Sequence, residues 1–557
     1  MSNGRFAKVL VLVAALSLLA AACGDSDDGD ASADTSAPET TAATETTASE
    51  TPETTAGEAT TTGAATETTA GAAGGERGGT LIWGLGSNGA NFFDPHMATN
   101  PFGRSWMYPF YDRLTEIDQE GAVQPMLATS WEFSDDGSTL TFELRDDVVF
   151  QDGTPFDAEA AKANLDRART QETGAGTFVD LLAVESVEVV GPYTVQLNLS
   201  SPGGALPAIL SDQAGMMISP AAFANPDLAT MPVGSGPFVP TEFRVDEVML
   251  AEAFEEYWDP ELPRVDNLEL QFVLDPTTRL NATASGEIDG GTLDIGLFTR
   301  EEAEGLGLAL TERFSTAIYH LFMNTERVPA LANPAVRRAI AMAIDQEGIN
   351  TALFNGQCTP TDQVFGEGWF PHNPDIGSDY IPYDPDMARQ IIEQEGAAGT
   401  EFTTITANIP SFVAQAEALQ AQLAEVGITM NVAPTPIPEL ISGFITNKTA
   451  DAYWSLTPGA PDPAKLVSTV WLPQSPFNPG GYEVPGLLEL HQQAQAATTE
   501  EERAPVYYEI AQLLADEQLT LAVCTPASIQ AHSPDVSNVQ LLSTLSDVDV
   551  SAIEVQG

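Results

Sequence analysis

The residues best suited to catalysis or metal binding are few and scattered in this chain of 557 residues. The sequence contains no His-Glu-x-x-His motif and no paired Cys-x-x-Cys motif. The stretch "VGSGPF" at 233–238 does not fit the Gly-x-Ser-x-Gly turn of a nucleophilic serine. We therefore expect no enzyme, no metal site and no cofactor, and we expect each histidine to face solvent or to be hydrogen-bonded. The five histidines are His96, His320, His372, His491 and His532.

Cys23 is the first of three cysteines, and it follows a short apolar segment. Arg5 and Lys8 precede the apolar run 9–22, which is too short to span a bilayer comfortably and has the length of a secretory signal core. Small residues directly before a cysteine at this place resemble the bacterial lipobox. The resemblance implies a signal peptide over 1–22, cleavage before Cys23 and acylation of its sulfur. The alternative is a plain signal peptide with an unrelated cysteine.

Cys358 and Cys524 remain as an even pair in the exported part of the chain. Secreted proteins commonly oxidise such pairs. We expect a disulfide between them. The alternative is two buried free thiols.

The segment 23–77 consists mostly of Thr, Ala, Glu, Gly, Asp and Ser and has no aromatic residue. It cannot bury enough apolar surface to offset the entropy of ordering, so we expect a disordered tether ahead of a folded body at 78–557. The chain carries 21 Lys+Arg against 80 Asp+Glu, a formal net charge of −59. This balance argues against nucleic acids and anionic membrane surfaces as partners.

The stretch "FQDGTPFDAEAAKANLDRA" at 150–168 is the most clearly patterned in the body. Asp152-Gly153 predicts a turn, and Asp157 predicts a helix start. Ala158, Ala161, Leu165 and Ala168 share one helical face. Upstream, apolar and polar residues alternate over 140–145, which predicts a half-buried strand closed by the "SDDGS" hairpin.

The second half of the body alternates strands with helices. The runs at 403–409 and 428–432 predict strands, and "SFVAQAEALQAQLAEVG" between them predicts a helix that ends at Gly427. Short connections between strand, helix and strand predict a parallel crossover. Asn333 and Pro334 predict the start of another helix.

Several motifs occur together in a fixed order: "FFDPH", "PMLATSWEF", "FQDGTPFDAEAAKANLDRA", "VGSGPF", "YWDPELPRVDNLEL", "SGEIDGG", "MNTERVP", "NPAVRRAIAMAID" and "AQLAEVGI". The chain resembles the family 5 extracellular solute-binding proteins, the oligopeptide-, dipeptide- and nickel-binding group of ABC transporters. The resemblance covers nearly all of 80–550. It implies an α/β, two-lobed type II periplasmic-binding-protein fold with an extra sub-domain, here preceded by the disordered tether.

The resemblance also implies a division of the body. Lobe I takes about 78–110, 231–319 and 523–557, the extra sub-domain about 111–230, and lobe II about 320–522. Chain crossings near 320 and 522 are the expected hinges. A ligand would bind between the lobes and close them.

Two stretches contain the ligand-binding residues that the resemblance implies. Thr99 and Asn100 follow "FFDPH". In "DAYWSLTPGAPDPAK", the resemblance matches Trp454 to an aromatic residue and Asp462-Pro463 to an Asp-Pro dipeptide of peptide-binding relatives. Tyr453 and Trp454 are suited to stacking on a ligand; the alternative is that both belong to the lobe core.

The aspartate with which those relatives hold a peptide's α-amino group has no counterpart here. Its place falls on Thr457 counted forward from Trp454, or on Gly459 counted back from Asp462. Either Asp462 takes this role or the ligand has no ammonium group, as in a saccharide or another polar solute.

The expected function is that of a monomeric, lipid-anchored extracytoplasmic receptor that delivers a peptide or similar polar solute to an ABC permease. Its partners are the small-molecule or peptide ligand, the permease complex and, through the lipid anchor, the membrane. The rival hypotheses are a receptor for a non-peptide solute, an extracytoplasmic enzyme and a chaperone-like binder on the same fold. A chaperone-like binder would need a broad, apolar cleft.

Overall fold

The computed structural model describes residues 77–86, 93–98, 103–119, 121–174, 176–313, 315–457, 459–542 and 548–556. The expected signal peptide lies outside these residues, and so does all of the expected tether except Arg77. No helix of the described part is both long and apolar enough to cross a membrane.

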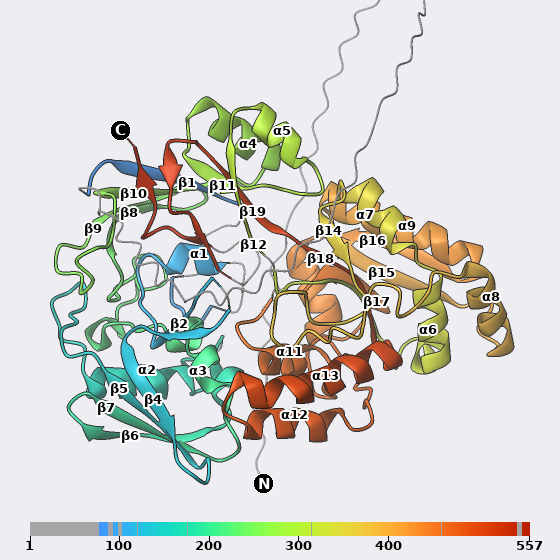
Figure 1. Cartoon of the computed structure of the whole chain (residues 1–557), viewed down its shortest axis with the longest axis horizontal. Helices are drawn as coiled ribbons and strands as arrows, with labels where there is room; N and C mark the ends of the chain where they lie inside the picture. Colours follow the sequence, from blue (N-terminus) through green and yellow to red (C-terminus); the bar gives the residue numbers. More distant parts are fainter. Residues whose placement is uncertain are drawn as a thin grey trace, which may run out of the picture. The chain divides into compact units, whose positions relative to one another are not determined.

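Lobe I is built on a seven-stranded sheet with the order β12-β19-β11-β1-β10-β9-β8 (Figure 1). Its strands are β1 (Thr80–Leu85), β8 (Phe238–Arg244), β9 (Val248–Ala253), β10 (Asn267–Phe272), β11 (Gly290–Thr292), β12 (Ala309–Arg313) and β19 (Ser528–His532). Its helices are α1 (Arg104–Met107), α4 (Pro276–Ser285) and α5 (Arg300–Gly305). Two short strand pairs follow β19: β20 (Val536–Ser537) with β23 (Glu554–Val555), and β21 (Gln540–Leu541) with β22 (Val548–Asp549). Their apolar residues join the core that includes Trp83.

The extra sub-domain contains a four-stranded antiparallel sheet with the order β4-β5-β7-β6. Its strands are β4 (Ala128–Phe133), β5 (Thr139–Leu144), β6 (Val184–Gly191) and β7 (Thr194–Leu199), and a separate pair joins β2 (Thr115–Ile117) to β3 (Val123–Pro125). Its helices are α2 (Ala158–Ala168), α3 (Leu206–Ile209), η2 (Phe178–Leu181), η3 (Gln213–Gly215) and η4 (Pro220–Ala222).

The patterned stretch at 150–168 folds as predicted. Gly153 has φ of +80°, which suits the turn, and the Asp157 side chain accepts a hydrogen bond from the Ala160 amide at 2.9 Å. The four small or apolar residues assigned to one face of α2 are all buried. The alternation on β5 is also confirmed. Leu140 and Phe142 of this strand are buried, whereas Glu143 is exposed. This stretch supplies the core of the extra sub-domain.

Lobe II is built on a six-stranded sheet with the order β14-β18-β13-β17-β15-β16. Its strands are β13 (Tyr319–Met323), β14 (Cys358–Pro360), β15 (Glu401–Ala407), β16 (Thr429–Thr435), β17 (Ala452–Leu456) and β18 (Thr520–Pro526). Its helices are η5 (Pro329–Ala332), α6 (Pro334–Met342), α7 (Gln346–Leu353), α8 (Pro385–Gln394), α9 (Pro410–Glu425), α10 (Ile437–Leu440), η6 (Ile441–Thr446), α11 (Pro463–Val470), α12 (Leu487–Ala496) and α13 (Glu500–Glu517).

The predicted parallel crossover in lobe II is confirmed. β15 pairs in parallel with β16, and α9 connects them and is followed by Gly427 at φ of +86°. Asn333 caps α6 by accepting from the Ala335 amide at 3.0 Å. The apolar residues of lobe II belong to two cores. One contains residues of α6, α7 and α9 and extends to lobe I residues such as Leu293 and Ala531, and the other contains residues of α11 and α13.

The chain passes between the two large sheets twice. It leaves lobe I after β12 and enters lobe II at β13, and it returns after β18 to β19. Figure 1 shows the return crossing, in which β18 and β19 follow one another from one sheet toward the other. This is the two-lobed arrangement expected from the sequence.

Candidate functional site

Parallel strands in both lobes mark where a ligand is expected. β1 runs parallel to β10 and β11, and β15 runs parallel to β16 and β17. Open α/β sheets bind ligands outside the carboxyl ends of such strands. The chain leaves β1 toward Thr99 and Asn100, and it leaves β17 toward Thr457 and Asp462. Thr457 and Asp462 therefore follow the end of β17 closely, whereas Thr99 and Asn100 come 14 and 15 residues after β1 in the sequence.

Thr99, Asn100 and Cys23 lie outside the described residues. The segment just before Thr99 is held by the extra sub-domain. The carbonyl of Ala98 accepts a hydrogen bond from Gln213 Nε2 at 3.4 Å, and Asp94 pairs with Arg167 of α2 through two hydrogen bonds of 2.9 and 2.5 Å.

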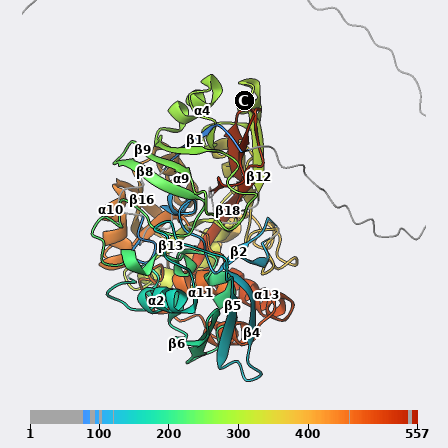
Figure 2. The same ribbon diagram turned by 90° about the vertical axis from the view of Figure 1, so that its left-hand side faces the viewer.

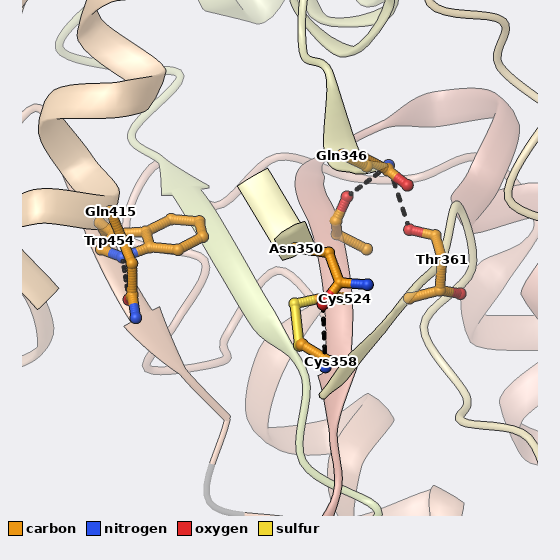
Figure 3. The surroundings of a disulfide bond; sticks show 8 residues. Gln346, Asn350, Cys358, Thr361, Gln415, Trp454 and Cys524 are labelled. Atoms are coloured by element: carbon orange, nitrogen blue, oxygen red, sulfur yellow. Dashed lines mark hydrogen bonds between the residues drawn. A yellow bond between two sulfur atoms is a disulfide. The ribbon is translucent and has the colours of Figure 1, made fainter. Parts of the chain in front are cut away.

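Trp454 lies inside lobe II rather than on its surface. Its side chain is fully buried, and its Nε1 donates to Gln415 Oε1 of α9 at 3.1 Å (Figure 3). The Trp454 ring stacks on Tyr319 with a centroid distance of 5.8 Å. Tyr453 points to the opposite face of β17, where it packs near Phe322 at 5.9 Å, and it is half-buried. Helices cover both faces of this strand, so alternation along it does not create a solvent-facing side.

Thr457 connects β17 to the first crossing between the lobes. Its Oγ1 accepts from the Ile318 amide at 2.9 Å, and its amide donates to the Ile318 carbonyl at 2.9 Å. The Thr457 side chain is fully buried. In this structure it fixes the end of the strand beside the hinge segment.

Asp462 caps α11 and is paired within lobe II. Its Oδ1 accepts from the Ala464 amide at 2.8 Å. Arg503 of α13 donates to both carboxylate oxygens, at 2.7 and 2.6 Å, and also to the Tyr507 hydroxyl at 3.2 Å. Burial alone would lower the pKa of Arg503, but the attraction and hydrogen bonds of Asp462 raise it above its usual value. The first turn of α11 is thus held by a buried, bidentate ion pair.

A group of four charged side chains, which sequence reasoning missed, connects α11 to the extra sub-domain. We call Lys465, Asp180, Asp212 and Arg104 the inter-lobe charge cluster. Lys465 Nζ lies 2.8 Å from Asp180 Oδ2 and 3.3 Å from Asp212 Oδ2. Arg104 Nη1 donates to the same Asp212 oxygen at 3.0 Å. Asp180 and Asp212 precede Lys465 by 285 and 253 residues, so local spacing could not reveal the cluster. The only signal is that Lys465 is one of four lysines in a very acidic chain.

The pKa directions show that the two aspartates differ. Burial alone would raise the pKa of Asp212, but Arg104 and Lys465 attract its charge and hold the pKa well below its usual value. Burial raises the pKa of Asp180, and Lys465 opposes that rise only in part. For Lys465, burial opposes the charge, while Asp180 and Asp212 raise its pKa above the usual value. Asp212 is therefore the firmly ionised centre of the cluster.

The two body cysteines are bonded to each other in the structure. Cys358 of β14 and Cys524 of β18 form a disulfide with a Cα–Cα distance of 5.6 Å, inside the lobe II core (Figure 3). The Cys358 amide also donates to Asn350 Oδ1 of α7 at 3.0 Å. The bond ties two neighbouring strands of the lobe II sheet.

The histidines do not converge. In the described part of the chain, no group of three or more His, Cys, Asp or Glu side chains is arranged to hold a metal ion. Four histidines have hydrogen-bond partners: His96 with the Met216 carbonyl, His372 with Phe365, His491 with Ser468, and His532 with Thr311. His320 is buried on β13 without such a partner among the described residues, and burial lowers its pKa to about 3.

An open groove on lobe II lies away from the strand ends described above. It runs along α12 and α13 and is lined by Glu489, Glu509, Asp516, Tyr508 and Leu513 among others. The groove touches neither Thr457 nor Asp462. Its position does not match the strand-end location expected for a ligand in this fold.

Comparison with known proteins identifies the family. The family model for bacterial extracellular solute-binding proteins, family 5, matches residues 122–478. The glutathione-binding protein GsiB of Escherichia coli strain K12 is 27% identical over 485 residues, which cover 82% of this chain and 91% of that protein.

Solved structures give the same result for the fold. The periplasmic binding protein DppA of Helicobacter pylori, in complex with the peptide STSA, superposes with a TM-score of 0.75 at 22% identity, covering 86% of this chain and 99% of that one. NikA of Brucella suis, in complex with Fe(III)-EDTA, superposes with a TM-score of 0.74 at 26% identity, covering 86% and 100%. The match of the family model over more than half of the sequence, together with the two-lobed fold, shows that the chain belongs to the family 5 extracellular solute-binding proteins of ABC transporters.

Proposed function

We propose that this protein is a lipid-anchored extracytoplasmic receptor that binds a peptide or a similarly polar solute between its lobes and delivers it to an ABC permease. The observation that carries this proposal is the family match over 122–478 on a body with two large sheets and two chain crossings. Such bodies close over a ligand by hinge motion. The role of the side chains is recognition rather than bond-breaking.

The ligand class rests on the relatives and on one feature of this chain. GsiB is named for glutathione, and the matched DppA structure holds a peptide, which favours a peptide-like solute here. Asp462, however, is already paired with Arg503 and caps α11. A buried ammonium needs a paired charge. A solute without an ammonium group, such as a saccharide, is therefore the second candidate.

The residues proposed for the site have two kinds of role. Thr99 and Asn100 would contact the solute directly, as the resemblance of the segment after "FFDPH" to the family implies. Tyr453 is half-buried, and Phe322 and Phe477 stack near its ring, so we propose that it supports the site from inside lobe II. Trp454 and Thr457 are fully buried, so we propose that they support the site from inside lobe II.

Calorimetric titration of the full chain in detergent tests the solute class. A pool of di- to pentapeptides and a panel of saccharides are titrated in separate experiments. A measurable heat of binding with the peptide pool supports a peptide-like solute. A heat of binding with the saccharides alone supports a saccharide. If neither set binds to a correctly folded chain, the proposed function is wrong for both classes.

Variants then test the proposed residues. We expect Trp454→Ala to weaken binding of either class, because the Trp454–Tyr319 stack that supports the site is lost, an effect of about 1 kcal/mol or more. If Asp462 binds a peptide ammonium, Asp462→Asn abolishes peptide binding while Thr457→Ala changes it little. Tight peptide binding by a folded Asp462→Asn variant would exclude Asp462 as the ammonium site.

The lipid anchor is tested separately at Cys23. Cys23→Ser is expected to leave the chain unprocessed or to release it from the membrane. The measurement is partition between water and detergent, with the double variant Cys358→Ser/Cys524→Ser as a control that retains Cys23. A Cys23→Ser chain that still partitions like the wild type would contradict the anchor.

A further inference from the structure

We propose that the inter-lobe charge cluster holds lobe II against the extra sub-domain, and that Lys465 sets how much of the ligand-free chain is closed. The proposal extends the proposed function, since closure is how such a receptor would retain its solute. It concerns the conformation of the chain itself, so it can be tested whatever the solute is.

The extra sub-domain is firmly joined to lobe I. Gln151 Nε2 donates to the carbonyls of Gly236 and Phe238, at 3.1 and 2.7 Å. Arg167 of α2 pairs with Asp94 at 2.5 Å, and both side chains are largely buried. Gln151 thus binds the backbone at the start of β8, and Arg167 binds the Asp94 carboxylate in the segment after β1, so the extra sub-domain is expected to move with lobe I.

The contact between the extra sub-domain and lobe II has a different character. Ala464 of α11 packs into the apolar core of the extra sub-domain. The Gly204 amide donates to the Gln495 carbonyl of α12 at 2.9 Å, and a Cβ at Gly204 would collide with the Ala497 carbonyl oxygen. Both figures place α11 beside the extra sub-domain (Figures 1 and 2). This is a close contact between small residues, with the charge cluster beside it.

The cluster balances its own charge only when the two parts are in contact. Lys465 and Arg104 together neutralise Asp180 and Asp212, and Lys465 is the member contributed by lobe II. Without Lys465, the two aspartates repel each other across a region in which Asp212 is almost fully buried. The whole chain has a net charge of −59. A lysine that neutralises two aspartates at a contact between its parts therefore favours closure.

The position of Lys465 is itself fixed by lobe II. Asp462 and Arg503 hold the first turn of α11, and the Lys465 amide donates to the Asp462 carbonyl at 3.1 Å. The lysine is therefore presented by a rigid helix start. Opening of the lobes would break the bonds of Lys465 to Asp180 and Asp212 while leaving the Asp462–Arg503 pair intact.

The test is a distance measurement between the extra sub-domain and lobe II in the ligand-free full chain. Spin labels are attached at Val190→Cys and Tyr383→Cys, two exposed positions in the respective parts, after stripping of any solute by unfolding and refolding. We expect a closed population in the otherwise wild-type chain, and a decrease of about tenfold in the closed-to-open ratio for Lys465→Met. Lys465→Arg should retain most of the closed population because it keeps the cation.

Three further variants separate charge from packing. Lys448→Met removes the other lysine of lobe II, which is exposed, and should leave the distances unchanged. Gly204→Ala should open the chain by steric conflict with Ala497 without changing charge, whereas Gly305→Ala, at a position with open space around it, should have no effect.

Some outcomes would overturn the proposal. The first is that the ligand-free wild-type chain is wholly open. The second is that Lys465→Met has the same closed population as Lys448→Met. A Gly204→Ala chain that stays closed would show that this contact does not separate when the lobes open, and would also overturn it. None of these outcomes depends on whether a peptide or saccharide binds, so failure here is distinct from failure of the proposed function.

Discussion

Two charged side chains at the start of α11, three residues apart, make different kinds of ion pair. Asp462 pairs with Arg503 inside lobe II, and both side chains are at most 4% exposed. Lys465 pairs with Asp180 and Asp212 of another part of the molecule and is 21% exposed. The first pair joins two helices of one folded unit. The second joins surfaces that we propose to separate, so loss of the first should affect stability and loss of the second should affect closure.

Among the variants, Arg503→Met is expected to lower the free energy of unfolding the most. This variant leaves Asp462 buried and without its cation, which typically costs about 3–5 kcal/mol in the free energy of unfolding. Urea unfolding of the variant beside the wild type measures this loss of stability. The control is Arg327→Met, which breaks a pair between an exposed arginine and Asp451 and should cost less than about 1 kcal/mol. Equal losses in the two variants would show that the Asp462–Arg503 pair does not stabilise lobe II as described.

The disulfide is the second fixed connection within lobe II. It closes a loop with a sequence separation of 166 residues. Replacing both cysteines by serine is expected to lower the free energy of unfolding by about 2–4 kcal/mol, chiefly because the unfolded chain gains freedom. The measurement is urea unfolding of the double variant beside the wild type. Thiol labelling of the denatured, unreduced wild type is the control, and two reactive body thiols there would contradict the disulfide.

Acid should affect the interior of lobe II through His320. Burial lowers its pKa from about 6.5 to about 3, so the folded chain binds fewer protons there than the unfolded chain between these values. The stabilising contribution is complete above pH 6.5 and is lost as the pH falls toward 3. We expect a loss on the order of 2–3 kcal/mol by pH 4.

The matched variant for this prediction is His320→Phe, which cannot take up a proton. Its stability relative to the wild type should improve steadily from pH 7 to pH 4 in urea unfolding. A constant difference over that range would show that His320 does not titrate on unfolding. Asp212 of the charge cluster should stay ionised throughout, because its pKa is held well below the usual value by Arg104 and Lys465 despite burial.

The smallest effect on stability is expected for Lys465→Met, although its effect on closure should be large. Lys465 is 21% exposed, and we propose that its contacts open without unfolding of either part, so we expect a loss within about 1 kcal/mol. The measurement is again urea unfolding, compared with Lys448→Met. A loss as large as that of Arg503→Met would mean that the two ionic groups on α11 have the same role, contrary to the comparison above.

Local signals in the sequence predicted much of the fold. Asp157, Asn333 and Gly427 mark helix ends because caps and positive φ depend on neighbouring residues only. The parallel crossover from β15 to β16 followed from short connections.

The site was harder to predict, because burial depends on distant segments. Trp454 was expected to stack on a ligand, but helices cover both faces of β17 and the ring is fully buried. Asp462 was a candidate for binding an ammonium group, yet Arg503, 41 residues away, already occupies both of its oxygens. The inter-lobe charge cluster joins residues far apart in the chain, and no spacing rule could predict it.

Mass spectrometry of the gently purified full chain tests the central claim most directly. Native spectra are compared with spectra after unfolding, which releases any bound small molecule. The account predicts a small polar solute, peptide-like in the first instance, that accompanies the folded chain and is absent after unfolding. A folded chain that carries no solute, and that takes up none from peptide or saccharide mixtures, would contradict the claim that this protein is a receptor for such solutes.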